Sequence, residues 1–277
     1  MHENYPKLLT YAYNITGSYE DAQDLVQDVM EKYISSDKTM IRNETNFLIK
    51  STINHAINFK NRAQKKMIYG EWLPEPLSLE NAENKLVKAQ TARYTLLVLL
   101  EKLSAKERAA YILKEGFDYK HEEIAEVLDI SIENSRKLLS RAKKQLQDVR
   151  FTPDRIDSPV HTEILDKYQR ALSEGSVPKL EELMLHDIKL AADGGKKIRV
   201  IKGIEVGRSA AALLLAYVQQ QFLVNKPCTY HFFNHQPAIC YWRENRIYNC
   251  QILDIDEEGM IRNIYSIVDP EKLRKLA

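Results

Sequence analysis

Apolar residues recur at helical spacing through most of the first 150 positions, most clearly in segment 119–146, YKHEEIAEVLDISIENSRKLLSRAKKQL. The inward positions on either side of a short break are Ile124, Ala125, Leu128, Leu138, Leu139 and Ala142. The break is Asp129-Ile130-Ser131, and the Ser131 hydroxyl can accept a backbone N–H of the next turn. The pattern therefore predicts two helices, 121–128 and one that begins at Ile132, joined by a tight turn.

The second of these helices has a polar outer side that is rich in basic residues. Its outward positions are Glu133, Asn134, Arg136, Lys137, Arg141, Lys143 and Lys144. A DNA major groove admits one helix, whose first turns meet base edges while basic groups contact phosphates. A solvated amphipathic helix pair would have a similar pattern, but the coincidence of turn, cap and one-sided basic face favours a DNA-binding helix-turn-helix.

An earlier helical pattern begins with the capping signal Ser18-Tyr19-Glu20-Asp21. Leu25, Val29 and Tyr33 form its apolar stripe. Its other side is acidic, with Asp21, Asp24, Asp28 and Glu31. Such a face is usually only solvated; the functional interpretation is a docking surface for a basic partner helix.

A third pattern covers 43–66, NETNFLIKSTINHAINFKNRAQKK. Its polar positions are Lys50, Asn54, Asn58, Lys60, Arg62, Lys65 and Lys66. Basic groups beside amides that can bond base edges suit nucleic acid. The lysines alone would also fit a solvated helix end that complements the helix dipole.

Two proline-containing breaks divide the chain, at 72–77 (WLPEPL) and at 151–159. Beyond the second break we expect helices at 160–172 and 177–185, a short strand pair around Gly194 and Gly195, and a long apolar helix at 204–222. Strand-like runs follow at 229–234, 238–243, 246–255 and 260–268. Their alternation and short turns predict an antiparallel sheet.

Whole-chain composition sets loose bounds. A chain of 277 residues suits two domains of ordinary size, and a net charge of +1 means that any nucleic-acid binding depends on local charge. Cys228, Cys240 and Cys250 are an odd set without close spacing, which fits a reducing compartment. No apolar run is long enough to span a bilayer and the N-terminus lacks a signal-peptide pattern, so we expect a cytoplasmic protein with no membrane contact.

These segments, in this order, resemble a bacterial sigma factor of the extracytoplasmic-function type. SYEDAQDLVQDVMEKY resembles the region 2 helix that grips the polymerase clamp, and FLIKSTINHAINFKNRAQKK the segment that opens and reads the −10 element. Segment 103–146 resembles region 4, whose last helix reads the −35 element, and Ser104-Ala105-Lys106-Glu107 adds a capping box at the start of one of its helices.

The linker WLPEPL is similar to the WLPEP linker of sigma factors that carry a fused SnoaL-like domain. ADGGKK at 192–197 resembles the DGGGK loop of that domain, with Lys196 where the third glycine usually lies. VDPEKL at 268–273 resembles its terminal NPDKL. The resemblance implies region 2 at 1–68, a linker at 69–88, region 4 at 89–150, a linker at 151–159 and a regulatory SnoaL-like domain at 160–277. The implied fold is multidomain, with two all-α sigma domains followed by an α+β cone with a curved antiparallel sheet.

The resemblance also implies residue roles. Clamp contacts fall on Asp24, Gln27, Asp28 and Glu31. Contacts to the −10 element fall on Asn54, Asn58, Lys60 and Arg62. Contacts to the −35 element fall on Glu133, Asn134, Arg136, Lys137, Arg141 and Lys144. The regulatory interface comprises Trp72, Pro74, Pro76, Asp193, Gly194, Gly195, Lys196, Asp269, Pro270 and Lys272. The implied partners are core RNA polymerase and promoter DNA, with no cofactor.

SnoaL-like folds include enzymes, and the candidate catalytic groups here are His231, His235, Tyr241, Arg243, Asp254 and Tyr265. No compelling acid–base pair emerges, so we expect no catalysis; a small-molecule ligand in the cone remains open. A metal site is disfavoured because His231 and His235 on one strand would stand about 13 Å apart. Two rival interpretations are a ligand-sensing one-component DNA-binding regulator and an enzyme with a DNA-binding extension. The acidic helix and the WLPEPL linker argue against the first.

Overall fold

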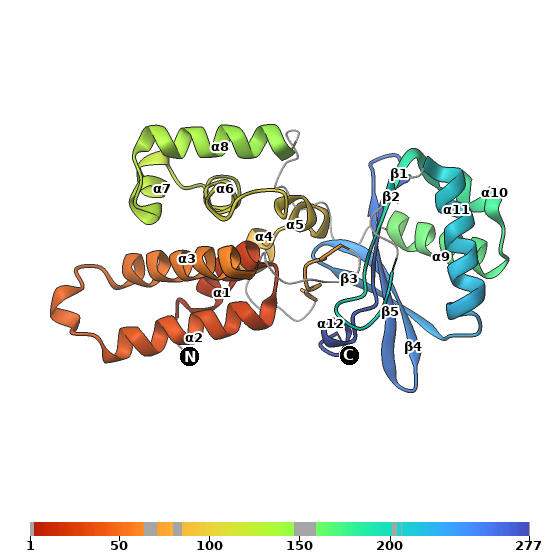
Figure 1. Ribbon diagram of the computed structural model, residues 1–277, viewed down its shortest axis with the longest axis horizontal. Coiled ribbons are helices and arrows are strands. Elements are labelled where there is room, and N and C mark those ends of the chain that lie inside the picture. Colours follow the sequence, from red (N-terminus) through yellow and green to blue (C-terminus); the bar gives the residue numbers. More distant parts are fainter. Residues whose placement is uncertain are drawn as a thin grey trace. The chain divides into compact units, whose positions relative to one another are not determined.

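The computed structural model describes residues 3–63, 71–79, 85–146, 159–200, 204–205 and 207–276 (Figure 1). They form two compact units. The helical unit comprises Met1–Lys66 and Asn81–Pro153, and the α+β unit comprises Met67–Glu80 and Asp154–Ala277. The described residues of the break at 72–77 therefore belong to the α+β unit, although the chain on both sides of them belongs to the helical unit.

The helical unit begins with α1 (Tyr5–Thr16), α2 (Tyr19–Ser35), the short 3-10 helix η1 (Lys38–Met40) and α3 (Glu44–Ala63). It continues with α4 (Lys85–Gln90), α5 (Tyr94–Leu100), α6 (Ala105–Tyr111), the π-helical turn η2 (Ile112–Gly116), α7 (His121–Leu128) and α8 (Ile132–Leu146). The α7–α8 pair confirms the predicted helix-turn-helix, and Asp129 makes the turn with a left-handed backbone at φ 52°.

Helix starts in this unit follow the capping signals in the sequence. The Ser18 hydroxyl accepts the Asp21 amide, which confirms the predicted start of α2. Ser104 and Glu107 form the reciprocal capping box at the start of α6. Beneath these helices lies an apolar core that includes fully buried Leu8, Ile53 and Leu97.

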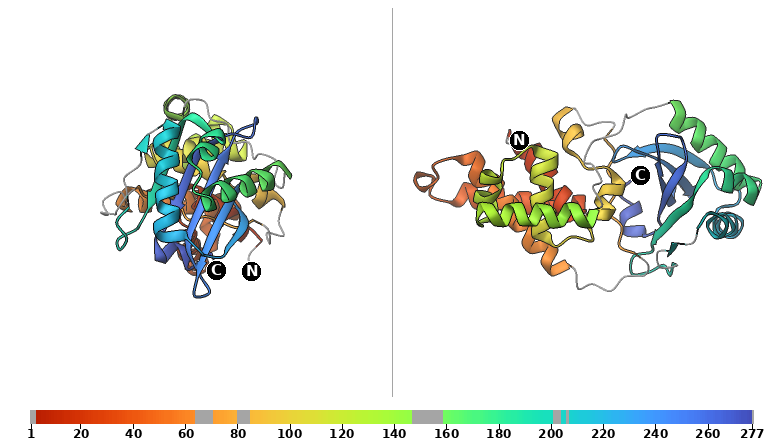
Figure 2. Two further views of the ribbon diagram at one scale, coloured as in Figure 1. Left: turned by 90° about the vertical axis from the view of Figure 1, so that its right-hand side faces the viewer. Right: turned by 90° about the horizontal axis from the view of Figure 1, so that it is seen from above.

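The described residues of the α+β unit contain a six-stranded sheet, and the longer helices of the unit lie on one face of it (Figure 2). Its strands are β1 (Met184–Asp193), β2 (Ile204–Glu205), β3 (Cys228–Phe233), β4 (Gln236–Arg243), β5 (Arg246–Ile255) and β6 (Ile261–Ile267), in the order β2-β1-β6-β5-β4-β3. Its helices are α9 (Pro159–Ser173), α10 (Val177–Glu182), α11 (Gly207–Val218), the π-helical turn η3 (Gln219–Leu223) and α12 (Pro270–Leu273).

The sheet differs from the expected one in its first strands. The expected strand pair near the glycines is present as a short antiparallel β1–β2 pairing, but β1 is ten residues long and also runs parallel to β6, while the other pairings are antiparallel. A parallel pairing joins segments far apart in the sequence, so local alternation cannot reveal it. The sheet is therefore mixed rather than wholly antiparallel.

Strand register assigns the side chains of the sheet to two faces. Ile239 pairs with Gln251 and Leu253 with Ile264, and these residues lie on the face covered by α9 and α11. Cys240 pairs with Cys250, and alternation places this pair on the opposite face. Both faces of the central strands are buried, which leaves β5 with buried side chains at seven consecutive positions from Asn249 to Ile255.

Candidate nucleic-acid and regulatory interfaces

Helix α8 separates a buried face from a polar one as the sequence predicted. Ser135, Leu138 and Leu139 are buried, and all six residues expected to contact the −35 element are exposed. The Ser131 hydroxyl accepts the Asn134 amide at 3.1 Å, which confirms the predicted cap. Between the two helices, His121 Nδ1 lies 3.0 Å from Ser135 Oγ, a polar contact that helps fix the angle of α8.

The first turn of α8 combines a carboxylate with two cations. Hydrogen bonds from the backbone amide of Glu133 and from the Ser131 side chain lower the pKa of Glu133. Arg136 and Lys137 lower it further. An ionised Glu133 can accept from the exocyclic amine of cytosine, whereas Arg136 suits a guanine edge. The start of α8 can therefore discriminate bases in a groove.

The four residues of α3 that are expected to contact the −10 element differ in their exposure to solvent. Asn58 and Arg62 are exposed, Asn54 is half-buried and Lys60 is buried. Asn54 Nδ2 donates to the carbonyl oxygen of Lys50 at 2.9 Å and to that of Val127 at 3.2 Å. In this conformation α7 thus occupies a hydrogen-bonding position of Asn54.

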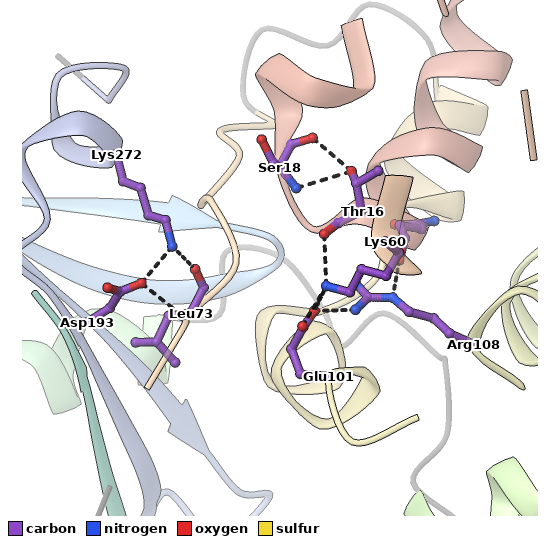
Figure 3. Close-up of polar contacts among 9 residues, drawn as sticks. Thr16, Ser18, Lys60, Leu73, Glu101, Arg108, Asp193 and Lys272 are labelled. Atoms are coloured by element: carbon purple, nitrogen blue, oxygen red, sulfur yellow. Dashed lines mark hydrogen bonds and ion pairs between the residues drawn. The ribbon is translucent and has the colours of Figure 1, made fainter. Parts of the chain in front are cut away.

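Lys60 lies in a buried polar cluster (Figure 3). Its Nζ donates to both carboxylate oxygens of Glu101, at 2.8 and 2.6 Å, and to the carbonyl oxygen of Thr16 at 3.2 Å. Arg108, which is fully buried, donates to the same carboxylate and, through Nε, to the carbonyl oxygen of Asn14 at 2.9 Å. Because two buried cations share one carboxylate, Glu101 joins α3 to the start of α6.

Further contacts join α1 to the later helices of the unit. Asn14 Nδ2 donates to the carbonyl oxygen of Gln90 at 2.7 Å, and Asn14 Oδ1 accepts the Ala92 amide at 3.1 Å. The Tyr11 ring stacks on Phe117 with centroids 4.0 Å apart, and its hydroxyl lies 2.9 Å from that of Tyr119. The segments that resemble regions 2 and 4 therefore pack together as one body.

The proposed clamp surface is the acidic face of α2. Asp24, Gln27, Asp28 and Glu31 are all exposed and follow one another at helical spacing. Gln27 Nε2 donates to Glu31 Oε1 at 3.0 Å. The surface is therefore preformed and accessible on the helix.

Between α2 and α3 lies a hollow of about 470 Å³ that Lys32, Lys50 and His55 help to line. Lys32 Nζ lies 3.1 Å from His55 Nε2. Burial, and next the Lys32 ammonium, lower the pKa of His55. The neutral imidazole is therefore favoured in the folded state.

Within the α+β unit, segment 71–79, called here the linker segment, pairs with the C-terminal domain along its length. The Glu71 amide donates to the carbonyl oxygen of Ala192 at 3.0 Å. At the other end, the Leu77 amide donates to Asn234 Oδ1 at 2.7 Å, and the Asn234 amide donates back to the Leu77 carbonyl at 3.0 Å. The linker segment thus docks beside the β3–β4 turn as well as at the end of β1.

A buried ion pair holds the middle of the linker segment (Figure 3). Lys272 Nζ lies 2.6 Å from Asp193 Oδ2 and also donates to the Leu73 carbonyl. Asp193 Oδ2 accepts the Leu73 amide at 2.9 Å. The ammonium also lies 4.4 Å from the centroid of the Trp72 ring, within cation–π range. Residues from three distant parts of the chain therefore meet around one charge pair.

The two glycines after Asp193 are required by their surroundings. A Cβ at Gly194 would lie 1.8 Å from the Ile198 carbonyl oxygen, and a Cβ at Gly195 would lie 2.4 Å from the Asp269 carboxyl carbon. Gly195 also has φ +58° and donates its amide to Asp193 Oδ1 at 2.8 Å. The turn therefore brings its backbone close to Asp269.

The other residues of the expected regulatory interface differ in their exposure to solvent. Pro74 and Pro76 are buried, whereas Lys196 and Pro270 are exposed. Asp269 caps α12 by accepting the Glu271 amide at 3.0 Å. Lys275 adds a contact that the sequence did not predict, to Glu75 Oε1 at 2.8 Å.

The candidate catalytic groups do not converge. Tyr241 lies on the helix-covered face, where its hydroxyl donates to Gln169 at 2.7 Å. Asp254 pairs in register with Asn263, whose amide donates to it at 2.6 Å, and alternation places both on the opposite face. Inside the cone, Tyr168 donates to Gln251 at 3.0 Å. The interior polar groups named here therefore bond to one another.

Contrary to the expectation from the sequence, His231 and His235 do not lie on one extended strand. β3 ends at Phe233, and His235 lies in a turn with φ 64° instead of continuing the strand. Among the described residues, no group of three or more His, Cys, Asp or Glu side chains is placed to hold a metal ion. None of the described helices is both long and apolar enough to cross a membrane.

Two family models match segments of the helical unit. Residues 1–66 match the family Sigma-70 region 2, and residues 93–146 match Sigma-70, region 4. The chain is 29% identical over 222 residues to the ECF RNA polymerase sigma factor SigJ of Mycobacterium tuberculosis, covering 77% of this chain and 70% of that protein. It is 22% identical over 277 residues to the probable sigma factor SigI of the same organism, covering 97% and 92%. The crystal structure of SigJ superposes with a TM-score of 0.73 at 24% identity and covers 96% of this chain and 94% of that one.

Proposed function

We propose that this chain recognises promoters through α3 and α8, and that its C-terminal domain regulates this activity by holding the linker segment. The proposal starts from the family: the chain belongs to the extracytoplasmic-function sigma factors and has a C-terminal SnoaL-like domain. The family directs RNA polymerase to promoters. The observation that carries the regulatory proposal is the buried Asp193–Lys272 pair on the Leu73 backbone.

Promoter contact divides between two helices. On α8, Glu133, Asn134, Arg136 and Lys137 lie in the part that would enter the −35 groove, while Arg141 and Lys144 lie nearer phosphates. On α3, Asn54, Asn58, Lys60 and Arg62 read or hold the −10 strand. Amides suit base edges and cations suit phosphates, so both helices carry the required groups.

Clamp binding is assigned to the acidic face of α2, defined by Asp24, Gln27, Asp28 and Glu31. The exposure of all four residues and their helical spacing support this assignment. The one-component regulator is the main alternative, and it needs no such surface. Co-purification with core polymerase and run-off transcription on genomic DNA test the two together. Polymerase-dependent transcripts with defined start sites support the sigma factor, whereas DNA binding without polymerase association would favour the alternative.

Regulation by the C-terminal domain follows from where the linker segment is bound. A sigma factor must separate its two DNA-binding halves to reach both promoter elements. The linker segment lies between these halves in the sequence and makes backbone hydrogen bonds to the C-terminal domain at Ala192, Asp193 and Asn234. Contacts made in one arrangement shift the population toward it. We therefore assign the domain a restraining role exercised by contact rather than by catalysis.

Shortening the chain just before Asp269 tests this role, because it removes Lys272 and leaves every strand of the sheet in place. Promoter-dependent transcription that rises supports restraint. Transcription that falls while core binding stays intact would mean that the domain assists at the promoter. Unchanged transcription and unchanged core binding would remove the support for regulation.

A further inference from the structure

Helix α7 of the same unit contacts the α3 surface that carries the −10 residues, at Asn54. Asn54 donates to the Val127 carbonyl, which lies in the last turn of α7. Carbonyls in a last turn lack helical partners and lie at the negative end of the helix dipole. Asn54 therefore meets an acceptor on α7 in the position where a base edge would otherwise offer one.

The electrostatics of this contact also match those of DNA. A hollow of about 350 Å³ between the two elements is lined on one side by Arg42, Asn46 and Lys50 and on the other by Tyr119, Glu123 and Glu126. Arg42 before α3 and Lys50 in its first half thus line the same hollow as the carboxylates of Glu123 and Glu126 on α7. The negative end of α7, with the Glu126 carboxylate in its last turn and Glu123 one turn earlier, presents to α3 the same sign of charge as a phosphate backbone.

The buried cluster around Glu101 fixes the position of α3 relative to the later helices. Lys60 reaches Glu101 at 2.6 Å, and its side chain is 7% exposed. A lysine held in this way cannot contact a phosphate, so closure also removes a cation from the −10 surface. Two of the four residues assigned to the −10 element are therefore engaged by later segments of the unit.

From these contacts we infer that α7 is an intramolecular competitor of the −10 strand. It covers the α3 surface through the Val127 carbonyl, Glu123 and Glu126, and single-stranded DNA must displace it. This inference rests on the proposed role of α3. It adds a restraint that lies wholly within the helical unit and does not depend on the linker segment. The polar face of α8 is exposed in this arrangement, so closure blocks the Asn54 and Lys60 contacts to the −10 strand and leaves the −35 contacts available.

A charge reversal on α7 tests the inference in the full-length chain. Glu126→Lys places a cation against Arg42 and Lys50 without disturbing a buried residue, and a lysine in the last turn suits the helix dipole. Glu122→Lys is the matched control, because Glu122 is exposed on the same helix but does not line the hollow. A lysine in the first turn opposes the dipole, so any general disruption of α7 would be larger in the control.

The measurement is the distance between spin labels on exposed positions of α2 and α8. Gln23 and Ser140 are exposed and can be replaced by cysteine for labelling, with Cys228 changed to serine because it is partly exposed. The probe is a mixed-sequence single-stranded 20-mer. We expect the 20-mer to lengthen the distance in the wild type. Glu126→Lys should lengthen it without DNA and tighten DNA binding about two- to tenfold, the modest size of a few exposed charge contacts.

Lys50→Glu should loosen closure by the same repulsion, and combining it with Glu126→Lys should restore the short distance. The inference is overturned if Glu126→Lys and its control have the wild-type distance, or if the 20-mer binds fully while the distance stays short. A distance that responds to Glu126→Lys with no DNA binding in any variant would support closure by α7 and count instead against the −10 assignment of α3.

Discussion

Replacing Lys272 with methionine should release the linker segment, because it removes the ammonium that binds Asp193 and the Leu73 carbonyl. The side chains of the pair are 9% and 1% exposed, so solvent compensates little. Removing one partner of a buried pair costs about 3–5 kcal/mol. Asp193 keeps two amide donors, from Leu73 and Gly195, and methionine keeps the aliphatic contacts. The expected loss is therefore at the lower end, about 3 kcal/mol.

Tryptophan fluorescence during urea unfolding measures this loss of stability in the α+β unit. The chain has two tryptophans, Trp72 and Trp242, and both belong to the α+β unit. The matched control is Lys197→Met, which breaks an exposed pair with Glu271 at 3.5 Å and should change stability by less than about 0.5 kcal/mol.

A double-mutant cycle with Asp193→Asn then measures the interaction energy between Lys272 and Asp193. The two substitutions should be non-additive by about 0.5–3 kcal/mol, because the residues are in direct contact. Additive effects, or a Lys272→Met chain as stable as the control, would refute the claim that this pair holds the linker segment.

Three other predictions concern the helical unit. Changing Asp24 and Asp28 to lysine should weaken binding to core polymerase by charge repulsion, and salt should already weaken the wild type; equal affinities in a pull-down titration would contradict the clamp assignment. Arg136→Ala should cost about 1–3 kcal/mol at the preferred −35 sequence, whereas Lys144→Ala should weaken all sequences alike; footprinting that finds equal losses on specific and random DNA for Arg136→Ala would exclude base reading. Burial lowers the pKa of His55 below its usual value of about 6.5, so the unfolded chain binds more protons just below that pH. The free energy of unfolding of the helical unit should therefore rise with pH through this window, and less so in His55→Gln, as urea titrations at several pH values can measure.

Local features explain what the sequence predicted well. The helix-turn-helix depends on apolar spacing and on the cap at Ser131, and the start of α6 on the cap at Ser104; such signals act within a few residues. The strands β3 to β6 follow from alternation and short turns. The parallel β1–β6 pairing was missed because it depends on contacts between segments about 75 residues apart, which leave no local pattern.

The candidate sites divide in the same way. Exposure of the α8 residues follows from helix periodicity, so sequence placed them correctly on one face. Burial of Lys60 could not be predicted, because its partner Glu101 is 41 positions away and a lysine near a helix end is normally solvated. One signal was available in α6, where Arg108 falls on an apolar face and so requires a partner.

Transcription by core polymerase with the Lys272→Met chain tests the central claim most directly. On a promoter that the wild type uses, this substitution should raise the yield of transcript relative to both the wild type and Lys197→Met, because the linker segment is no longer held by the C-terminal domain. A yield equal to the wild type, from a chain whose tryptophan fluorescence reports the expected loss of stability, would contradict the proposal that this contact restrains the sigma factor.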